Sequence, residues 1–321
     1  MKQRILLVAP YVGEFGWELM NWHGRIRHLA RSGRYDRIIV AAPADRQALF
    51  RADEDKAITL HPINLPTLPG MASEDHRITA DGQRVPCKAI RFIFSRILRS
   101  VATARDLNPA EIEFMLPDLN GQLWPTAPSD QVFTDLRIQG PATTDVLLIP
   151  RRRDMAIERN QPDRWWDELE ARFNDNGLRV ERYADGLYAA IAQLSRTRLA
   201  IGASTGGLHL ASLCRCPHYV WGCDSSLRWT ALRMSNRQRY ETFWNPLGTP
   251  VIYDEVGWRP DVDYVVKQTC RALERIGLAR GRSETHSPSM NWRVRRGLAR
   301  VVETGAAWPW RVRQLVHEAL L

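Results

Sequence analysis

The chain has 321 residues, of which 44% are hydrophobic and 25% charged, so it has the composition of an ordinary globular protein and the length of about two domains. Its net charge of +9 comes from 45 basic residues, only four of them lysine, and it suits an anionic membrane or a phosphorylated small molecule. Nucleic acid is not an expected partner because no zinc finger, RNP sequence or basic zipper is present, and no run of about 18 apolar residues predicts a membrane span.

The first elements alternate between strand and helix. Residues 4–10, RILLVAP, form an apolar run that predicts a buried strand; the run is too short for a signal peptide, so we expect a cytoplasmic protein. A GEFG turn precedes apolar residues at helical spacing between 17 and 30. A second buried strand at 37–43 and a helix-like segment at 44–52 follow. This order predicts a parallel sheet with right-handed crossovers.

The middle of the chain is less regular. Residues 60–86 contain four prolines and a hairpin signal at Asp81-Gly82, and residues 89–104 predict a helix. Residues 117–143 contain four prolines and few periodic apolar positions, so we expect the interdomain linker there.

The second half alternates more clearly. Predicted strands occupy 145–150, 178–184, 197–204, 218–222 and 249–255, and predicted helices occupy 161–177, 187–196, 206–214 and 261–277. This is the pattern of a doubly wound α/β domain, whose ligands bind beyond the carboxyl ends of the strands. The loops after Pro10, Pro150, Ser204 and Gly222 are therefore the candidate ligand loops.

The turn after the strand at 197–204 has the composition of an anion site. Ser204 and Thr205 can cap the next helix or donate to an oxygen, and Gly206 and Gly207 allow an anion to approach the backbone. His209, one turn later, is expected to face the same ligand. The alternative is an ordinary capped turn with a partly buried histidine.

The loop after the strand at 145–150 is rich in arginine. Arg151, Arg152 and Arg153 follow the strand directly, and Arg159 comes soon after. Guanidinium groups suit diphosphates, and two anion-binding loops on one sheet predict a nucleotide-diphosphate site. The alternative is that at least one of these arginines is simply solvated.

The loop after the first strand carries a candidate base. Its glycines allow a tight turn that presents Glu14 at the edge of the sheet, where a carboxylate can accept a proton from a sugar hydroxyl. The alternative is that Glu14 or Glu18 caps the following helix. Candidate acceptor residues beside Glu14 are Gly13, Gly16, Trp17 and Asn21.

No metal is expected. The five cysteines are odd in number and unevenly spaced, which argues against a disulfide framework. The spacing of Cys214, Cys216 and Cys223 with His218 is a poor match to a zinc site. The acidic pair at 261–263 resembles a metal-binding D-x-D but opens a predicted helix, so it is interpreted as a cap.

Three segments resemble the ADP-heptose:lipopolysaccharide heptosyltransferase-like family of GT-B glycosyltransferases. Gly13-Glu14 resembles the Gly-Asp that supplies that family's proposed base. Residues 158–180 resemble the basic, Trp-containing stretch of its donor domain, and residues 204–222 resemble its D-T-G-P-x-H-L-A-A segment. The chain departs from the pattern, with Ser204 in place of Asp, Gly207 in place of Pro and Glu14 in place of Asp. The RRRD sequence also resembles the phosphate loop of GDP-fucose-dependent enzymes.

The resemblance implies two Rossmann-like, doubly wound domains facing across a cleft. Residues 1–135 would hold the acceptor, a glycan or glycolipid, and residues 144–280 the nucleotide sugar. It implies metal-independent, inverting glycosyl transfer without a cofactor. Glu14 would be the base, and the loops at 151–159 and 204–209 would bind the diphosphate. Two alternatives are an epimerase of the same fold, and a non-catalytic nucleotide or carbohydrate binder.

The C-terminal segment, 281–321, has seven arginines, three acidic residues and three tryptophans. GT-B enzymes return a C-terminal helix to the first domain, and this segment can do the same. The alternative is that residues 285–321 form basic amphipathic helices that contact an anionic membrane on its inner face.

Overall fold

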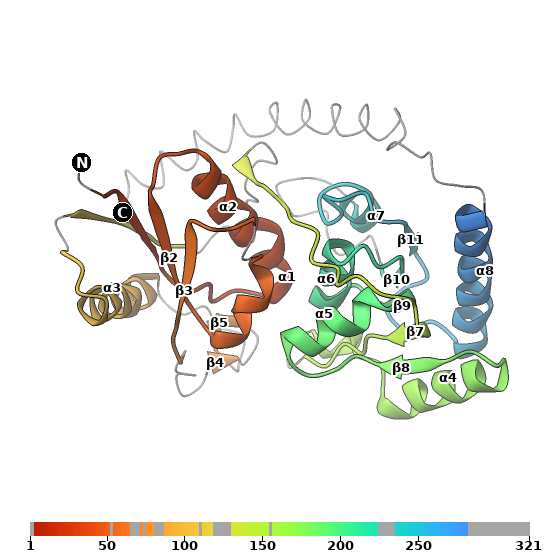
Figure 1. Cartoon of the computed structure of the whole chain (residues 1–321). Helices are drawn as coiled ribbons and strands as arrows, with labels where there is room; N and C mark the ends of the chain where they lie inside the picture. The colour runs from red at the N-terminus through yellow and green to blue at the C-terminus, as the bar shows by residue number, and fades with distance from the viewer. Residues whose placement is uncertain are drawn as a thin grey trace.

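A computed structural model of the chain describes residues 3–51, 54–64, 71–72, 75–79, 87–108, 111–117, 130–153, 156–223 and 235–281. These residues form two parallel sheets, each in its own half of the molecule (Figure 1). Helices cover both faces of each sheet. The fold class is therefore α/β with two Rossmann-like, doubly wound units, as predicted.

The first sheet has the strand order β3-β2-β1-β6 and all of its pairs are parallel. Its strands are β1 (Ile5–Val8), β2 (Arg37–Ala42), β3 (Ile58–Pro62) and β6 (Ile112–Met115). Helix α3 (Cys87–Ala104) packs on the face that carries Leu7 and Ile39, and the helices after β1 pack on the other face. The sequence patterns indicated β1, β2 and α3 but not β6, which has only four residues and exposed positions in its middle.

The helix predicted after β1 consists of three parts. These are α1 (Phe15–Trp17), a π-helical segment η1 (Glu18–His23) and α2 (Gly24–Arg31). All six residues of η1 are buried, because η1 lies between the first sheet and the second half. Leu19 and Met20 face the second half, whereas Trp22 packs on the first sheet.

Two further expectations concern the first half. The helix-like segment at 44–52 is a 3₁₀ helix, η2 (Ala44–Leu49). A hairpin is present, but its antiparallel strands are β4 (Met71–Ala72) and β5 (Asp75–Thr79), so it precedes the predicted turn. Asp81-Gly82 lies outside the described residues.

The second sheet has the order β11-β10-β9-β7-β8, again with parallel pairs only. Its strands are β7 (Thr144–Leu148), β8 (Val180–Arg182), β9 (Thr197–Ala203), β10 (His218–Trp221) and β11 (Val251–Asp254). Each of them matches a predicted strand to within a few residues.

Helices of the second half lie on both faces of this sheet (Figure 1). They are α4 (Asp163–Asp175), α5 (Leu187–Ser195), α6 (Gly206–Leu213), α7 (Asn236–Glu241) and α8 (Val262–Gly281), together with a single turn η5 (Ile157–Arg159). The predictions lacked only α7, a short helix with a capping box at Ser235. Asp261 accepts hydrogen bonds from the backbone of Asp263 and Tyr264, which confirms that it caps α8.

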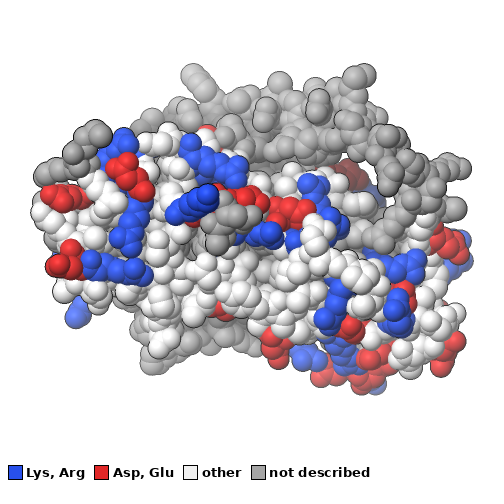
Figure 2. All heavy atoms as spheres, viewed as in Figure 1, with Lys and Arg blue, Asp and Glu red and all other residues white. Residues whose placement is uncertain are grey.

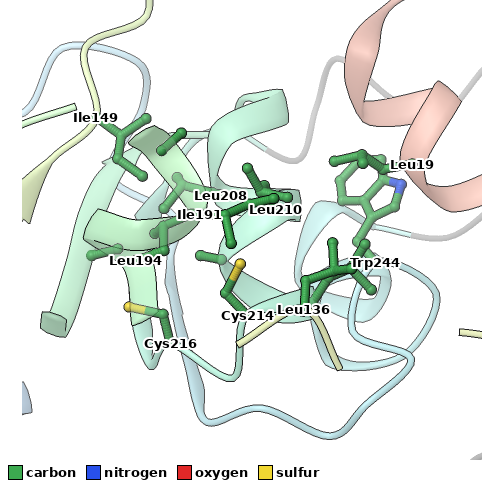
Figure 3. Close-up of a cluster of buried hydrophobic side chains, with 14 of the residues drawn as sticks. Leu19, Leu136, Ile149, Ile191, Leu194, Leu208, Leu210, Cys214, Cys216 and Trp244 are labelled. Carbon is green, nitrogen blue, oxygen red and sulfur yellow. The ribbon is translucent and has the colours of Figure 1, made fainter. Parts of the chain in front are cut away.

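One hydrophobic core joins the two halves. Leu19, Met20 and Leu49 of the first half are buried in the same cluster as Leu210 and Trp244 of the second. Figure 3 shows Leu19 lying beside the Trp244 indole. The two units are therefore packed against each other at this point.

The chain between the sheets contacts both units. The backbone N–H of Val132 donates to Gly24 in the first unit, and the N–H of Leu136 donates to Leu213 in the second. Residues 118–129 of the predicted linker, and residues 282–321 with both interpretations of the C-terminal segment, lie outside the described residues. The boundaries at 1–135, 144–280 and 281–321 remain predictions.

Charged side chains of both signs intermingle on the surface. Figure 2 shows such mixtures along the boundary between the two halves and along the edge that carries α4. Within the described ranges, no helix combines the length and apolar composition needed to cross a bilayer.

Candidate functional site

The strand orders locate the candidate site. In the first sheet the chain moves outward from β1 through β2 to β3 and then returns to place β6 on the other side of β1. In the second sheet β7 lies between β8 and β9 in the same way. Ligands of such sheets bind at these reversals, beyond the carboxyl ends of the strands. The loops after β1, β7 and β9 are therefore the relevant ones. The sequence also predicts the loop after Gly222, most of which lies outside the described residues.

The loop after β1 contacts the loop after β7 through charged side chains. A carboxylate oxygen of Glu14, Oε1, lies 2.5 Å from Nη2 of Arg153. Both side chains are partly exposed, at 30% for Glu14 and 20% for Arg153, so a ligand can reach them. Glu14 is the N-cap residue of α1, but its side chain makes no capping hydrogen bond. The candidate base and a candidate phosphate-binding arginine thus meet across the two halves.

Glu18 does not cap the helix either. Its two oxygens accept hydrogen bonds from Nε of Arg46 at 3.0 Å, and Oε1 lies 3.2 Å from Nε2 of His23. Burial opposes ionisation of Glu18, but Arg46 and His23 outweigh it and hold the pKa of Glu18 below its ordinary value. Glu18 is therefore a buried, paired carboxylate and is not available as a base.

Arg151 is buried within the loop after β7 and holds that loop through hydrogen bonds. Its guanidinium is buried and donates to the carbonyl of Ala156 and to the side chain of Asn160, which in turn donates to the carbonyl of Arg153. Ala156 has a left-handed backbone (φ 52°), a strained conformation for a residue with a Cβ. Burial and the neighbouring cations Arg153 and Arg159 lower the pKa of Arg151 to about 10. The geometry thus assigns Arg151 to holding the loop, although the sequence pattern predicted a phosphate contact.

The other arginines of this loop differ from one another. Arg152 is exposed and forms an ion pair with Asp163, which is the solvated alternative that the sequence left open. Arg159 places its guanidinium carbon 4.3 Å from the centroid of the Trp258 ring. The Nε–H groups of Arg153 and Arg159 are buried and donate to no acceptor in the part of the chain that the structure describes. Buried donors of this kind require an acceptor, and a bound anion would supply it.

The loop after β9 is packed more closely than the sequence pattern suggested. Ser204 Oγ accepts a hydrogen bond from the hydroxyl of Tyr240, and Thr205 is the N-cap of α6 without a side-chain cap. A Cβ at Gly206 would lie 3.0 Å from the Phe15 ring, and a Cβ at Gly207 would lie 2.8 Å from Ile149. The glycines are therefore required by close packing, and an additional contact with an anion remains a prediction.

His209 lies in the contact between the two halves. It is buried, and its ring is 4.5 Å from the Trp244 ring, centroid to centroid, and 5.4 Å from the Tyr240 ring. Burial, helped by His218 and Arg239, lowers the pKa of His209 to about 3, so the ring is neutral at pH 7. The side chain faces Gly16 of α1, whereas the sequence pattern predicted that it would face a ligand.

The acceptor candidates next to Glu14 have different surroundings. Gly13 lies against the ring of Tyr11, and Gly16 lies against His209. Trp17 is half-buried and its ring is 6.0 Å from that of Phe243, while Asn21 is buried in η1. Gly16 and Trp17 therefore contribute to the contact between the halves, and acceptor binding by the four residues remains a prediction.

The cysteines of the weak zinc-like pattern belong in part to the hydrophobic core. Cys214 and Cys216 are buried, and burial raises the pKa of the Cys214 thiol well above its ordinary value, the opposite of a metal-bound thiolate. Nδ1 of His218 is paired with the carbonyl oxygen of Cys216. Among the residues that the structure describes, no group of three His, Cys, Asp or Glu side chains is arranged to hold a metal ion.

Several residues of this region were not identified from the sequence. They are Phe15, Asn160, Tyr240, Trp244 and Trp258. Asn160 had a signal, because an amide a few residues beyond an arginine cluster can order that loop. The aromatic residues had none, since each contacts a partner that is distant in the chain.

Comparison with known proteins gives matches of structure only. No family model matches the chain, and no curated protein matches it. A glycosyl transferase of family 9 from Veillonella parvula is 11% identical with a TM-score of 0.49, and the match covers 86% of this chain and 99% of that one. The E. coli heptosyltransferase WaaC with ADP is 12% identical with a TM-score of 0.43, over 84% and 99% of the two chains.

A third match is the iron-containing dodecameric glycosyltransferase TibC from enterotoxigenic E. coli, which is 14% identical with a TM-score of 0.38. The match covers 80% of this chain but only 64% of TibC. With every one of these identities at 14% or below and every TM-score under 0.5, the function of this chain has to be argued from its own residues.

Proposed function

We propose that the protein is a glycosyltransferase that takes its sugar from a nucleotide diphosphate. One observation carries the proposal: Glu14 from one sheet reversal lies 2.5 Å from Arg153 at the other, and the buried Nε–H of Arg153 donates to no acceptor among the residues that the structure describes. A carboxylate next to an excess of positive charge suits a reaction in which a hydroxyl loses a proton and a diphosphate leaves.

In the proposed reaction Glu14 accepts the proton of the acceptor hydroxyl, and the acceptor oxygen forms a bond to the anomeric carbon of the sugar. The bond from that carbon to the diphosphate oxygen breaks, and the electron pair leaves with the diphosphate. Arg153 and Arg159 and the N-terminus of α6 at Thr205–Gly207 would stabilise the charge on the leaving group. Because two guanidinium groups supply this charge, we propose a single, inverting displacement that is metal-independent and needs no cofactor.

The position of Arg151 supports the proposal that this loop binds the diphosphate. It holds the 151–160 loop through Ala156 and Asn160 and so fixes the backbone of Arg153. A diphosphate held by side chains needs such a rigid loop, because small displacements of binding groups reduce the rate strongly.

The resemblance of the sequence motifs extends the proposal to a heptosyltransferase-like enzyme whose acceptor, a glycan or glycolipid, binds beside Gly13, Gly16, Trp17 and Asn21. We also propose that it acts in the cytoplasm, with residues 285–321 in contact with an anionic membrane. We propose polysaccharide biosynthesis as the process in which this glycosyl transfer takes part.

The first experiment is a thermal-shift screen of the full chain with ADP, GDP, UDP, dTDP and inorganic pyrophosphate. A nucleoside diphosphate that binds the folded state should raise the unfolding midpoint by mass action. If none of the five ligands shifts the midpoint, the donor site is wrong.

The second experiment tests the base with nucleotide sugars of the nucleotide that the screen selects. Glu14→Gln should reduce transfer by about 10²–10⁴-fold and keep nucleotide binding. The control is Glu113→Gln, an isosteric change at a carboxylate that is also paired with an arginine, Arg34, but lies away from the site; it should keep full transfer.

The alternatives give different outcomes. An epimerase would convert the nucleotide sugar without any acceptor, and a non-catalytic binder would bind the nucleotide but turn over no donor. Full transfer by Glu14→Gln would exclude Glu14 as the base.

A further inference from the structure

Helix α3 differs from the other long helices in its charge. From residue 82 to residue 105 the chain contains no acidic residue but six cations. Three of them, Arg91, Arg96 and Arg99, are exposed on α3, and no ion pair in the described part of the chain involves them. Exposed arginines elsewhere are commonly paired, such as Arg172 with Asp263 and Arg237 with Glu255.

The two faces of α3 have different roles. The inner face, with Ile90, Phe94 and Leu98, is buried against the first sheet. The outer face carries the three arginines and Phe92, whose side chain is 63% exposed and lies 5.9 Å from the guanidinium carbon of Arg96. Phe92 contributes nothing to the core, and its ring and the three guanidinium groups are together at the surface of the helix.

A second exposed aromatic lies on the same side of the sheet. Phe114 of β6 is in register with Leu7 of β1, and Leu7 packs against α3, so both side chains point to that side. Phe114 is 45% exposed and belongs to an edge strand. Helix α3, which carries the exposed arginines and Phe92, lies at the end of the molecule farthest from α8 (Figure 1).

We propose that this surface, formed by Arg91, Phe92, Arg96 and Arg99, docks the protein on an anionic lipid bilayer. Charge complementarity identifies the partner as an anion, and the exposed Phe92 favours a lipid surface, since its ring can enter the boundary between headgroups and acyl chains while the guanidinium groups bind phosphates. The inference does not depend on glycosyl transfer and involves residues other than 285–321.

The test is co-sedimentation of the full chain with two kinds of vesicle, phosphatidylcholine alone and phosphatidylcholine mixed with phosphatidylglycerol. The wild type should bind only the mixed vesicles, and raised salt should weaken binding. The triple variant Arg91→Gln, Arg96→Gln, Arg99→Gln should partition on the order of 100-fold more weakly, from roughly fivefold for each cation. Phe92→Ser, which leaves the charge unchanged, should weaken binding by roughly fivefold.

A matched control removes the same charge elsewhere. Arg164→Gln, Arg271→Gln, Arg275→Gln changes three exposed arginines of α4 and α8 and should bind like the wild type. All of the substituted residues are exposed, so the variants should fold, which circular dichroism checks. An equal loss in the control would show that net charge alone causes binding and would overturn the proposal. So would an α3 variant that keeps vesicle binding, or a wild type that binds heparin or RNA but no vesicles.

Discussion

The contact between the two halves has an apolar part and a charged part that lie side by side. In the apolar part, Leu19, Met20 and Trp17 of the first half pack against Phe243 and Trp244 of the second. In the charged part, Glu14 faces Arg153, with Arg151 and Arg159 nearby. The apolar part is buried and tightly packed, whereas the side chains of Glu14 and Arg153 are 30% and 20% exposed.

The apolar part and the charged part therefore contribute differently to stability. Burial of large apolar side chains stabilises the association of the halves, whereas a partly exposed ion pair contributes little to stability. The charged part is therefore free to exchange one anionic partner for another. Three predictions test this division, in order of decreasing effect on the free energy of unfolding.

The largest effect should come from Gly16→Ala. A Cβ at this position would lie 2.2 Å from Nδ1 of His209, and the rings of Trp244 and Tyr240 keep His209 from moving away. We expect a loss of about 2–3 kcal/mol in the free energy of unfolding, measured by denaturant titration. Gly140→Ala is the control, because a Cβ there meets nothing within 4 Å.

A double-mutant cycle identifies the cause of that loss. In a His209→Ala background the added methyl group has space, so Gly16→Ala should cost less than about 1 kcal/mol. If the two changes are simply additive, the two residues are not in contact and the apolar part is wrongly described.

An intermediate effect should appear as the pH is lowered. Burial lowers the pKa of His209 to about 3 and that of His218 to about 4, whereas both titrate near 6.5 in the unfolded chain. Because the unfolded state then binds more protons, the stability is fully present above pH 6.5 and is lost as the pH falls below it. Each histidine should cost about 2 kcal/mol at pH 5, and the share of His209, which a His209 variant isolates, is the intermediate effect.

The measurement is the free energy of unfolding between pH 7 and pH 5 for the wild type and for His209→Gln. The variant should show a shallower decrease with falling pH, whatever its stability at pH 7. An unchanged slope would mean that His209 is protonated in the folded protein and is not buried in the contact.

The smallest effect on stability should come from the charged part. Arg153→Gln and Glu14→Gln should each change the free energy of unfolding by less than about 1 kcal/mol, because the pair is partly exposed. Their effects on anion binding should be opposite. Arg153→Gln should weaken pyrophosphate binding by roughly tenfold or more, whereas Glu14→Gln should strengthen it because it removes a competing carboxylate.

Isothermal titration with pyrophosphate checks this prediction, and Arg152→Gln is the control because Arg152 pairs with Asp163 at the surface. A large loss of stability in Arg153→Gln or Glu14→Gln would show that the charged part stabilises the fold. Equal pyrophosphate binding by these two variants and the control would show that it does not bind the anion.

Much of this architecture could be predicted from the sequence. The alternation of apolar runs with helical patterns predicted the strands of the second sheet and placed Arg153 and Ser204 at the ends of β7 and β9. Such patterns succeed because a strand buried on both faces and an amphipathic helix each have a local signature. Short elements with weaker signatures, such as β6 and α7, were not predicted.

The roles of individual side chains depended on contacts over long distances in the chain. His209 and Gly16 are 193 positions apart, and only the packing of the two halves brings His209 against α1. Arg151, Arg152 and Arg153 are equivalent in sequence, yet one is buried in its loop, one is solvated and one meets Glu14.

By itself, then, the sequence determined the fold class, the positions of the loops after β1, β7 and β9 and the types of residue they carry, because hydrophobic periodicity and turn chemistry act over a few residues. The tertiary structure alone decided which of these residues pair and which remain available to an anion. The physical reason is that burial and ion pairing depend on neighbours that the fold, and not the local sequence, brings together.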